Sequence, residues 1–429
     1  MIRLTRRCLF AAPAMVGLST RPLSSAAQAA ALAPLKIGVL VTLEGPFVAS
    51  GQDGLRGLEL ALRAAGYSAA GRRIETVIGP TDARPDVALR QARKLIEQDR
   101  VDFIIGPLSG SEGIALRDYA KTVPDRTIIN GSSAALETTF IDPAPNFFRF
   151  ITHGLQWGAG LGEYVVQTKG WRRIASVAAD YSFGHTNFMG FAIDFCRAGG
   201  DIVRRFWVPL GQADFGSVVA QLPDDVDAIY LGLGGTDAIN FLNQYLQAGT
   251  RMNFIGGSAM ADQTILSSRG RAREALIGTP TSGMISDENP APAWQAFVRS
   301  YREGFPEGQR FASPSFFATS YFIAARAALT ALEAVRGDLS DGQAAFQRTL
   351  ATLVLDTPLG PIRLDENRQA IGPVFVSEVM QRADGSLHNR MVKRIDNVNQ
   401  TLGLSLEEFR ALGLPGRETP MCARLRRSG

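Results

Sequence analysis

The chain has 429 residues, of which 45% are apolar and 20% are charged, a composition typical of a globular protein with more than one domain. Its net charge of +4 comes from 45 basic and 41 acidic residues. Four of the arginines lie in the first 29 residues, which hold no acid, so removing them leaves 41 charges of each sign. A neutral remainder gives no support for nucleic-acid binding.

The N-terminal segment has the layout of an export signal. Arg6 and Arg7 precede a short apolar run at 11–18, and small residues follow at 26–30. The run is shorter than the roughly 20 residues that a membrane span needs, and its proline and glycine argue against an ordinary N-terminal helix. We therefore expect a cleaved signal over residues 1–29 and a periplasmic protein, with the paired arginines favouring the twin-arginine route.

Strands and helices alternate after the signal, a pattern typical of parallel sheets. The first run has expected strands at 35–41, 74–78, 101–105 and 127–129, and helices at 54–65, 85–98 and 114–122. The second run has strands at 174–178, 202–208, 228–233 and 253–256, and helices at 187–198, 215–222 and 238–248. Two such runs predict an α/β fold of two doubly wound, Rossmann-like lobes.

A third segment is mostly helical. Helices are expected at 293–301, 315–335 and 342–352, followed by strands at 360–364 and 374–380. At the C-terminus, Arg417, Arg424, Arg426 and Arg427 form a basic run that we interpret as a solvated tail.

The loops at the expected strand ends are rich in glycine and serine, at 106–113 and 130–133. Ligands of open parallel sheets bind beyond the carboxyl ends of the strands. Small residues let a ligand approach the backbone, and helix N-termini with serine hydroxyls favour an anion such as a carboxylate. The same residues would also serve as helix caps, so binding and capping both remain open.

The second run offers comparable loops at 180–184, 232–236 and 256–258. Aromatic residues beside glycines there could cover the apolar face of a ligand, or they could fill the core.

Enzyme and metal motifs are weak. The glycines at 232–235 lack the third glycine of a dinucleotide fingerprint, and no phosphate loop or nucleophile elbow occurs. His153, His185 and His388 stand alone, so we expect no metal and no cofactor. Cys196 and Cys422 could form a disulfide in an oxidising compartment, although spacing alone does not show that they are close.

Several stretches together resemble the periplasmic Leu/Ile/Val-binding protein family, the type I solute-binding proteins of ABC importers. They are Lys36-Ile37-Gly38-Val39-Leu40, Gly45-Pro46, Gly51-Gln52-Asp53-Gly54, Phe103-Ile104-Ile105-Gly106-Pro107, Ile129-Asn130-Gly131-Ser132-Ser133, Asn146-Phe147-Phe148-Arg149, Asp180-Tyr181-Ser182-Phe183-Gly184 and Asp214-Phe215. Each stretch is loose, but their order and spacing are specific to the family.

The resemblance implies two lobes joined by three crossover strands, near 150–152, 278–282 and 356–361. Lobe 1 would hold 34–150 and 281–356, lobe 2 would hold 151–280 and 357–400, and 401–429 would be a C-terminal extension. It also implies that a monomer closes on a small solute and presents it to an ABC permease in the inner membrane.

Carried over position by position, the resemblance implies a ligand site made of Ser109, Gly110, Ser111, Ser132, Ser133, Ala134, Phe183, Gly234 and Ser258. Gly110 replaces the serine with which amino-acid binders hold the α-carboxylate, and Phe183 replaces a tyrosine. Ser258 stands where those binders use a glutamate to hold the ligand's ammonium.

A buried ammonium without an acidic partner is costly. We therefore hypothesise that the ligand is an aromatic or short aliphatic acid without an α-ammonium. An amino acid stays open, with Asp237 or Asp262 as the substitute acid. A periplasmic ligand-sensing subunit and, less favoured, a secreted α/β hydrolase are the other functions considered.

Overall fold

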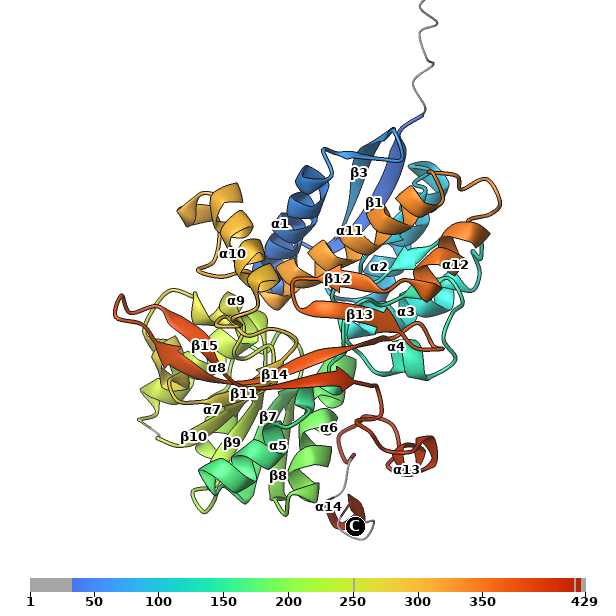
Figure 1. Ribbon diagram of the computed structural model, residues 1–429. Helices are drawn as coiled ribbons and strands as arrows, with labels where there is room; N and C mark the ends of the chain where they lie inside the picture. Colours follow the sequence, from blue (N-terminus) through green and yellow to red (C-terminus); the bar gives the residue numbers. More distant parts are fainter. Residues whose placement is uncertain (1–32, 250, 420–421, 426–429) are drawn as a thin grey trace, which may run out of the picture. The chain divides into compact units, whose positions relative to one another are not determined.

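The structure is a computed structural model that describes residues 33–249, 251–419 and 422–425. Within these residues the strands form a six-stranded and a nine-stranded sheet, with helices packed on both (Figure 1). The expected export signal lies outside the described residues, as do Arg426 and Arg427 of the basic run.

The first sheet has the strand order β2-β3-β1-β4-β5-β6, and all its pairs are parallel except β2 with β3. Its strands are β1 (Leu35–Thr42), β2 (Ser68–Ala69), β3 (Arg72–Thr81), β4 (Phe103–Ile105), β5 (Ile128–Ile129) and β6 (Phe147–Phe148). The helices on this side are α1 (Val48–Ala64), α2 (Pro85–Arg93), α3 (Gly110–Ala120), α4 (Glu137–Phe140), α10 (Pro292–Gly304), α11 (Phe316–Ala334) and α12 (Ala344–Thr352).

The second sheet has the order β12-β13-β14-β11-β10-β9-β7-β8, with β15 also paired to β14. Its strands are β7 (Arg173–Ala179), β8 (Asp201–Val208), β9 (Ala228–Gly232), β10 (Asn253–Gly256), β11 (Pro280–Gly283), β12 (Leu355–Thr357), β13 (Gly360–Leu364), β14 (Ala370–Gln381) and β15 (Leu387–Val398). The helices on this side are α5 (Leu161–Tyr164), α6 (Ser182–Arg197), α7 (Gly216–Ala220), α8 (Gly235–Gln247) and α9 (Gln263–Leu266). The strands from β7 to β11 pair in parallel, and β12 to β15 add antiparallel pairs.

The chain ends in α13 (Leu406–Ala411) and α14 (Cys422–Leu425). Cys196 and Cys422, 226 residues apart in sequence, form a disulfide between α6 and α14. The pairing that the sequence left open is therefore present in the structure.

The expected α/β fold of two doubly wound sheets is confirmed, and most expected elements lie within a few residues of their observed bounds. Several elements differ. Helices α1 and α6 begin at Val48 and Ser182 rather than at 54 and 187. Strands β2, β6 and β15 and the short helices α4, α5, α9, α13 and α14 were not expected. The lobe boundaries given above stay a prediction.

Helix α11 returns the third segment of the chain to the first sheet (Figure 1). The hydroxyl of Tyr321 donates to the Leu40 carbonyl at 2.6 Å. The buried carboxylate of Asp53, in α1, accepts from the Ser315 N–H at 3.1 Å and from the Tyr301 hydroxyl at 2.5 Å. These bonds hold the N-terminus of α11 in place, and Phe316 begins that helix.

A buried guanidinium joins the end of the first sheet to β14. Arg149 has no exposed surface, and it donates to the carbonyl of Ala135 at 2.7 Å and to the side chains of Gln369 and Thr139 at 2.5 Å each. Its backbone also bonds to the segment at 368–370. Burial lowers the pKa of Arg149 to about 9, so the group is still charged at neutral pH.

Replacing Arg149 by a smaller, apolar residue should destabilise the fold. Arg149→Leu leaves the Ala135 carbonyl buried without a donor, at roughly 1–3 kcal/mol, and removes the hydrogen bonds that Arg149 donates to the side chains of Gln369 and Thr139. We expect the free energy of unfolding in urea, followed by circular dichroism, to fall by about 3 kcal/mol. The control is Arg90→Ala, which removes a solvent-exposed ion pair with Asp86 and should cost about 0.5 kcal/mol or less. Equal losses in the two variants would contradict the role given to Arg149.

Candidate functional site

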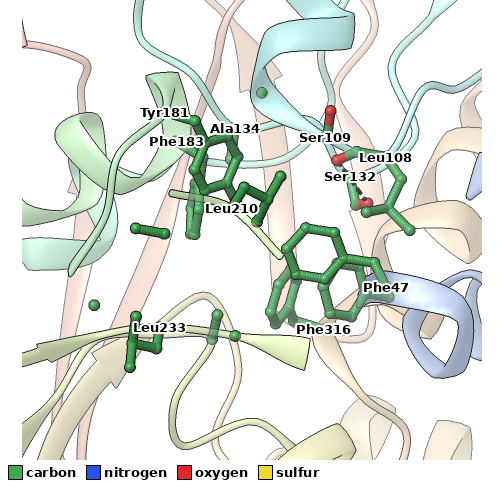
Figure 2. Close-up of a pocket in the computed structure, with 16 residues that line it drawn as sticks. Phe47, Leu108, Ser109, Ser132, Ala134, Tyr181, Phe183, Leu210, Leu233 and Phe316 are labelled. Atoms are coloured by element: carbon green, nitrogen blue, oxygen red, sulfur yellow. Dashed lines mark hydrogen bonds between the residues drawn. The ribbon is translucent and has the colours of Figure 1, made fainter. Parts of the chain in front are cut away.

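One cavity is walled by loops that follow the carboxyl ends of parallel strands from both sheets, where open α/β sheets bind ligands. The lining residues are Phe47, Leu108, Ser109, Gly110, Ser132, Ala134, Ala179, Tyr181, Phe183, Leu210, Gly232, Leu233, Gly234, Ala259, Phe316 and Phe317. Figure 2 shows Ser109 and Ser132 beside Leu108, with Phe47 and Phe316 on one side of the cavity and Tyr181 and Phe183 on another.

The polar end of the cavity is the N-terminus of α3. Ser109 is the N-cap: its hydroxyl donates to the Ala83 carbonyl at 3.0 Å and accepts from the Glu112 N–H at 3.4 Å. The Ser109 hydroxyl is therefore committed to the fold. The next two N–H groups, of Gly110 and Ser111, have no acceptor within the helix and carry the positive end of its dipole. The cap therefore uses the hydroxyl of Ser109 and leaves these two backbone N–H groups without an acceptor in the helix.

Ser132 supplies the second polar group. Its hydroxyl lies 3.4 Å from the Leu108 carbonyl oxygen, which makes a long hydrogen bond that a better acceptor can replace. Its backbone N–H is already bonded to the Pro107 carbonyl at 3.0 Å. The hydroxyl is therefore the atom that Ser132 offers to a ligand.

The remaining walls are apolar and largely aromatic. Trp157 packs behind them, with ring centroids 5.8 Å from Phe183 and 5.2 Å from Phe316. Tyr181 lies 6.0 Å from Phe183, and burial raises the pKa of its phenol, which stays neutral and can hydrogen-bond. Such walls suit a flat apolar ligand body.

Loops of the two sheets touch each other across this site. The Ser111 and Ser182 hydroxyls lie 3.0 Å apart, and a Cβ on Gly110 would lie 3.0 Å from the Phe183 Cβ. Gly235, with φ of +57°, approaches Pro46 so closely that a Cβ would lie 2.2 Å from its carbonyl oxygen. The structure therefore has the two sides of the cavity in contact, which encloses whatever occupies it.

Six of the nine residues expected at the site line this cavity: Ser109, Gly110, Ser132, Ala134, Phe183 and Gly234. The other three do not. Ser111 bonds to Ser182, and the hydroxyl of Ser133 is buried against Gly113, where an added Cβ would lie 1.9 Å from it. Ser258 lines a neighbouring cavity with Asp262 and bonds to Asn187.

The two acids considered as ammonium partners are engaged elsewhere. Asp262 caps α9 through the Thr264 N–H at 3.0 Å and accepts from the Phe316 N–H at 2.9 Å. Burial raises its pKa to about 7. Asp237 accepts from the Gly211 N–H at 2.8 Å, and burial raises its pKa also. Among the described residues that line the cavity, none has an acidic side chain.

Phe47, Leu210 and Phe316 line the cavity but were not expected there. Phe47 follows Gly45-Pro46, directly after the first strand, and this turn signal could have located it. Phe316 begins helix α11, about 60 residues beyond the last expected strand of the second run at 253–256, and no local pattern points to it.

None of the three histidines lines this cavity. His153 is fully buried, and its burial keeps its pKa well below the usual range. His185 and His388 pair with Asp180 and Glu288, at 2.8 and 2.7 Å. Over the described parts of the chain, no cluster of three potential metal ligands occurs. The helices of those parts also include none with both the length and the apolar character needed to cross a bilayer.

A family model described as periplasmic binding protein matches residues 34–385. The Leu/Ile/Val-binding protein homolog 6 of Brucella melitensis biotype 1 is 22% identical over 379 residues, which cover 87% of this chain and 94% of that protein.

Two solved structures are similar over 86% of this chain. An ABC transporter substrate-binding protein from Sphaerobacter thermophilus is 30% identical, with a TM-score of 0.76 over 99% of its length. A solute-binding protein of an ABC transporter from Rhodopseudomonas palustris BisB5, solved in complex with 3,4-dihydroxybenzoic acid, is 25% identical, with a TM-score of 0.77 over 98% of its length. The chain therefore belongs to the periplasmic binding protein family, as a non-enzymatic solute-binding protein of the Leu/Ile/Val-binding, ABC-transporter type.

Proposed function

We propose that this protein captures a small carboxylic acid without an α-ammonium, preferably an aromatic one, in the cavity between its two sheets. The acid is then delivered to an ABC permease of the inner membrane by a periplasmic monomer. The observation that carries the proposal is the lining itself: two serines and a helix N-terminus at one end, aromatic and aliphatic side chains elsewhere, and no acid among the described lining residues.

The carboxylate would bind at the N-terminus of α3. The N–H group of Gly110 and the hydroxyl of Ser132 would donate to it, and the N-terminal end of a helix favours negative charge. The ring would lie among Phe47, Phe183 and Phe316, which supply apolar contact. The Rhodopseudomonas protein with bound 3,4-dihydroxybenzoic acid supports this class of ligand.

An ammonium finds no comparable partner. Enclosing an ammonium in this lining would leave its charge without a counter-ion. Burying even a neutral polar group without a hydrogen bond costs about 2–7 kcal/mol, and burying an unpaired charge costs more. The Oδ1 atom of Asp237 is buried and has no hydrogen-bond partner among the described residues, which makes Asp237 the acid to examine if an amino acid binds.

Paired ligands that differ only in the ammonium test the proposal. We expect 3-phenylpropionate to raise the Tm of the mature protein and phenylalanine to leave it unchanged, and likewise 4-methylpentanoate against leucine. At 100 times its Kd a ligand stabilises the fold by about 2.7 kcal/mol, which a thermal-shift assay detects. Benzoate and 3,4-dihydroxybenzoate complete the panel.

Each contrary result has a distinct meaning. Preference for phenylalanine and leucine over their des-amino analogues would overturn the ligand class, and Asp237→Asn would then identify the ammonium site. Binding of the acids without uptake in cells that carry the partner permease would favour a periplasmic ligand-sensing subunit over a transport role.

Ser132→Ala tests the position of the carboxylate. A hydrogen bond to a charged group contributes roughly 1.5–3 kcal/mol, so the Kd for the best acid of the panel should rise about tenfold to a hundredfold in titration calorimetry. Ser133→Ala is the matched control, because the Ser133 hydroxyl faces Gly113 and not the cavity. This substitution should leave the Kd within about twofold of the wild-type value. An unchanged Kd in Ser132→Ala would place the carboxylate elsewhere.

A further inference from the structure

The described part of the C-terminal extension, residues 401–419 and 422–425, is fastened to helix α6. It lies beyond the match to the family model, which ends at 385. Phe409 and Leu412 of the extension pack with Met189 and Ile193 of α6 in one buried cluster, which also contains the disulfide. The extension is thus anchored by both apolar contacts and a covalent bond.

Between these anchors, Arg417 contacts the second sheet through both its backbone and its side chain. Its carbonyl accepts hydrogen bonds from the side chains of Arg205 and Trp207, each at 3.1 Å, which fixes the backbone against β8. Its guanidinium makes a two-point contact with the carboxylate of Asp180: Nε lies 3.1 Å from Oδ1, and Nη2 bonds to Oδ2. The planar fork of arginine suits such a contact, which fixes direction as well as distance.

Asp180 opens the loop that lines the cavity. Its N–H bonds to the Val208 carbonyl at 2.7 Å, and the next residues, Tyr181 and Phe183, line the cavity wall. The other partner of its carboxylate is His185 Nε2, at 2.8 Å, one turn into α6. The Asp180 carboxylate therefore ties three segments together: the loop, α6 and the extension.

We propose that Arg417 is a positioning residue for the ligand site: through Asp180, the disulfide-anchored extension holds the segment at 180–184, which is Asp180, Tyr181 and the start of α6, in the conformation that places Tyr181 and Phe183 against the ligand. This inference rests on the proposed function, because the loop matters for affinity only if the cavity binds the solute. Arg417 itself does not line the cavity.

The size of the effect follows from exposure. The Arg417 side chain is 66% exposed, and exposed ion pairs contribute little to global stability. Because the backbone of Arg417 is already held against β8, little further entropy is lost when its side chain pairs with Asp180. We therefore expect the pair to order the segment at 180–184 locally, without a measurable effect on global stability. We expect Arg417→Ala to raise the Kd for the acid by about threefold to tenfold, with no change in the Tm of the unliganded protein.

The experiment compares three variants of the full mature chain with the wild type: Arg417→Ala, Arg417→Lys and the control Arg410→Ala, an exposed arginine of α13. The probes are 3,4-dihydroxybenzoate and 3-phenylpropionate in titration calorimetry. Hydrogen exchange of the peptide that covers 180–188 is measured without ligand. We expect faster exchange and weaker binding in Arg417→Ala, partial rescue in Arg417→Lys, which keeps the charge but not the fork, and no change in Arg410→Ala.

A second set of variants tests whether the extension acts through Arg417. Cys196→Ser/Cys422→Ser should weaken binding in the same direction, and adding Arg417→Ala to it should change the Kd by less than about twofold, because the contact is already loosened. Full additivity would overturn the inference, as would loop exchange identical to the wild type in Arg417→Ala. If the loop exchanges faster but neither probe binds the wild type, the positioning contact stands and the proposed ligand class fails.

Discussion

The structure depends most on a single buried cation. Arg149 sits where the chain leaves the first sheet, and its guanidinium holds the carbonyl of Ala135 on one side and the amide of Gln369 on the other. The loop that it holds also carries Ser132 and Ala134 of the cavity. The buried guanidinium of Arg149 therefore contacts both the segment that leads into β14 and the loop that places Ser132 and Ala134 in the cavity wall. Such a network has a specific shape only when all its members are satisfied.

Much of the fold was predictable because parallel strands are buried on both faces. The runs at 35–41 and 174–178 are mostly apolar, with Lys36 and Ser176 as the polar exceptions, and both are strands in the structure. Strand β15 was missed for the opposite reason: Leu387–Val398 carries Arg390, Lys393 and Arg394 on exposed positions and resembles a polar loop. The start of α1 was missed because glycines at 51 and 54 lower helix propensity, although Gly51 is needed where the helix passes the Thr42 carbonyl.

The residues of the cavity were predictable only in part, because the sequence indicates where loops meet but not where each side chain points. Residues on strand-end loops, such as Gly110 and Phe183, could be located because topology places those loops together. The direction of each side chain could not be read from the chain: Ser132 and Ser133 are neighbours, yet only the first lines the cavity. The roles of Asp237 and Asp262 could not be predicted either. Each acid accepts from a backbone N–H group that is distant in sequence, that of Gly211 for Asp237 and that of Phe316 for Asp262.

The disulfide has a consequence for when the protein becomes complete. Disulfides persist in oxidising compartments and are rare in the cytosol, and this one closes across 226 residues to fasten the last segment of the chain. Without this bond, α14 would not be tied covalently to α6. For a periplasmic binding protein, the disulfide would form in the oxidising compartment where the protein meets its solute. The oxidation state of Cys196 and Cys422 would then distinguish molecules that have reached that compartment from those that have not.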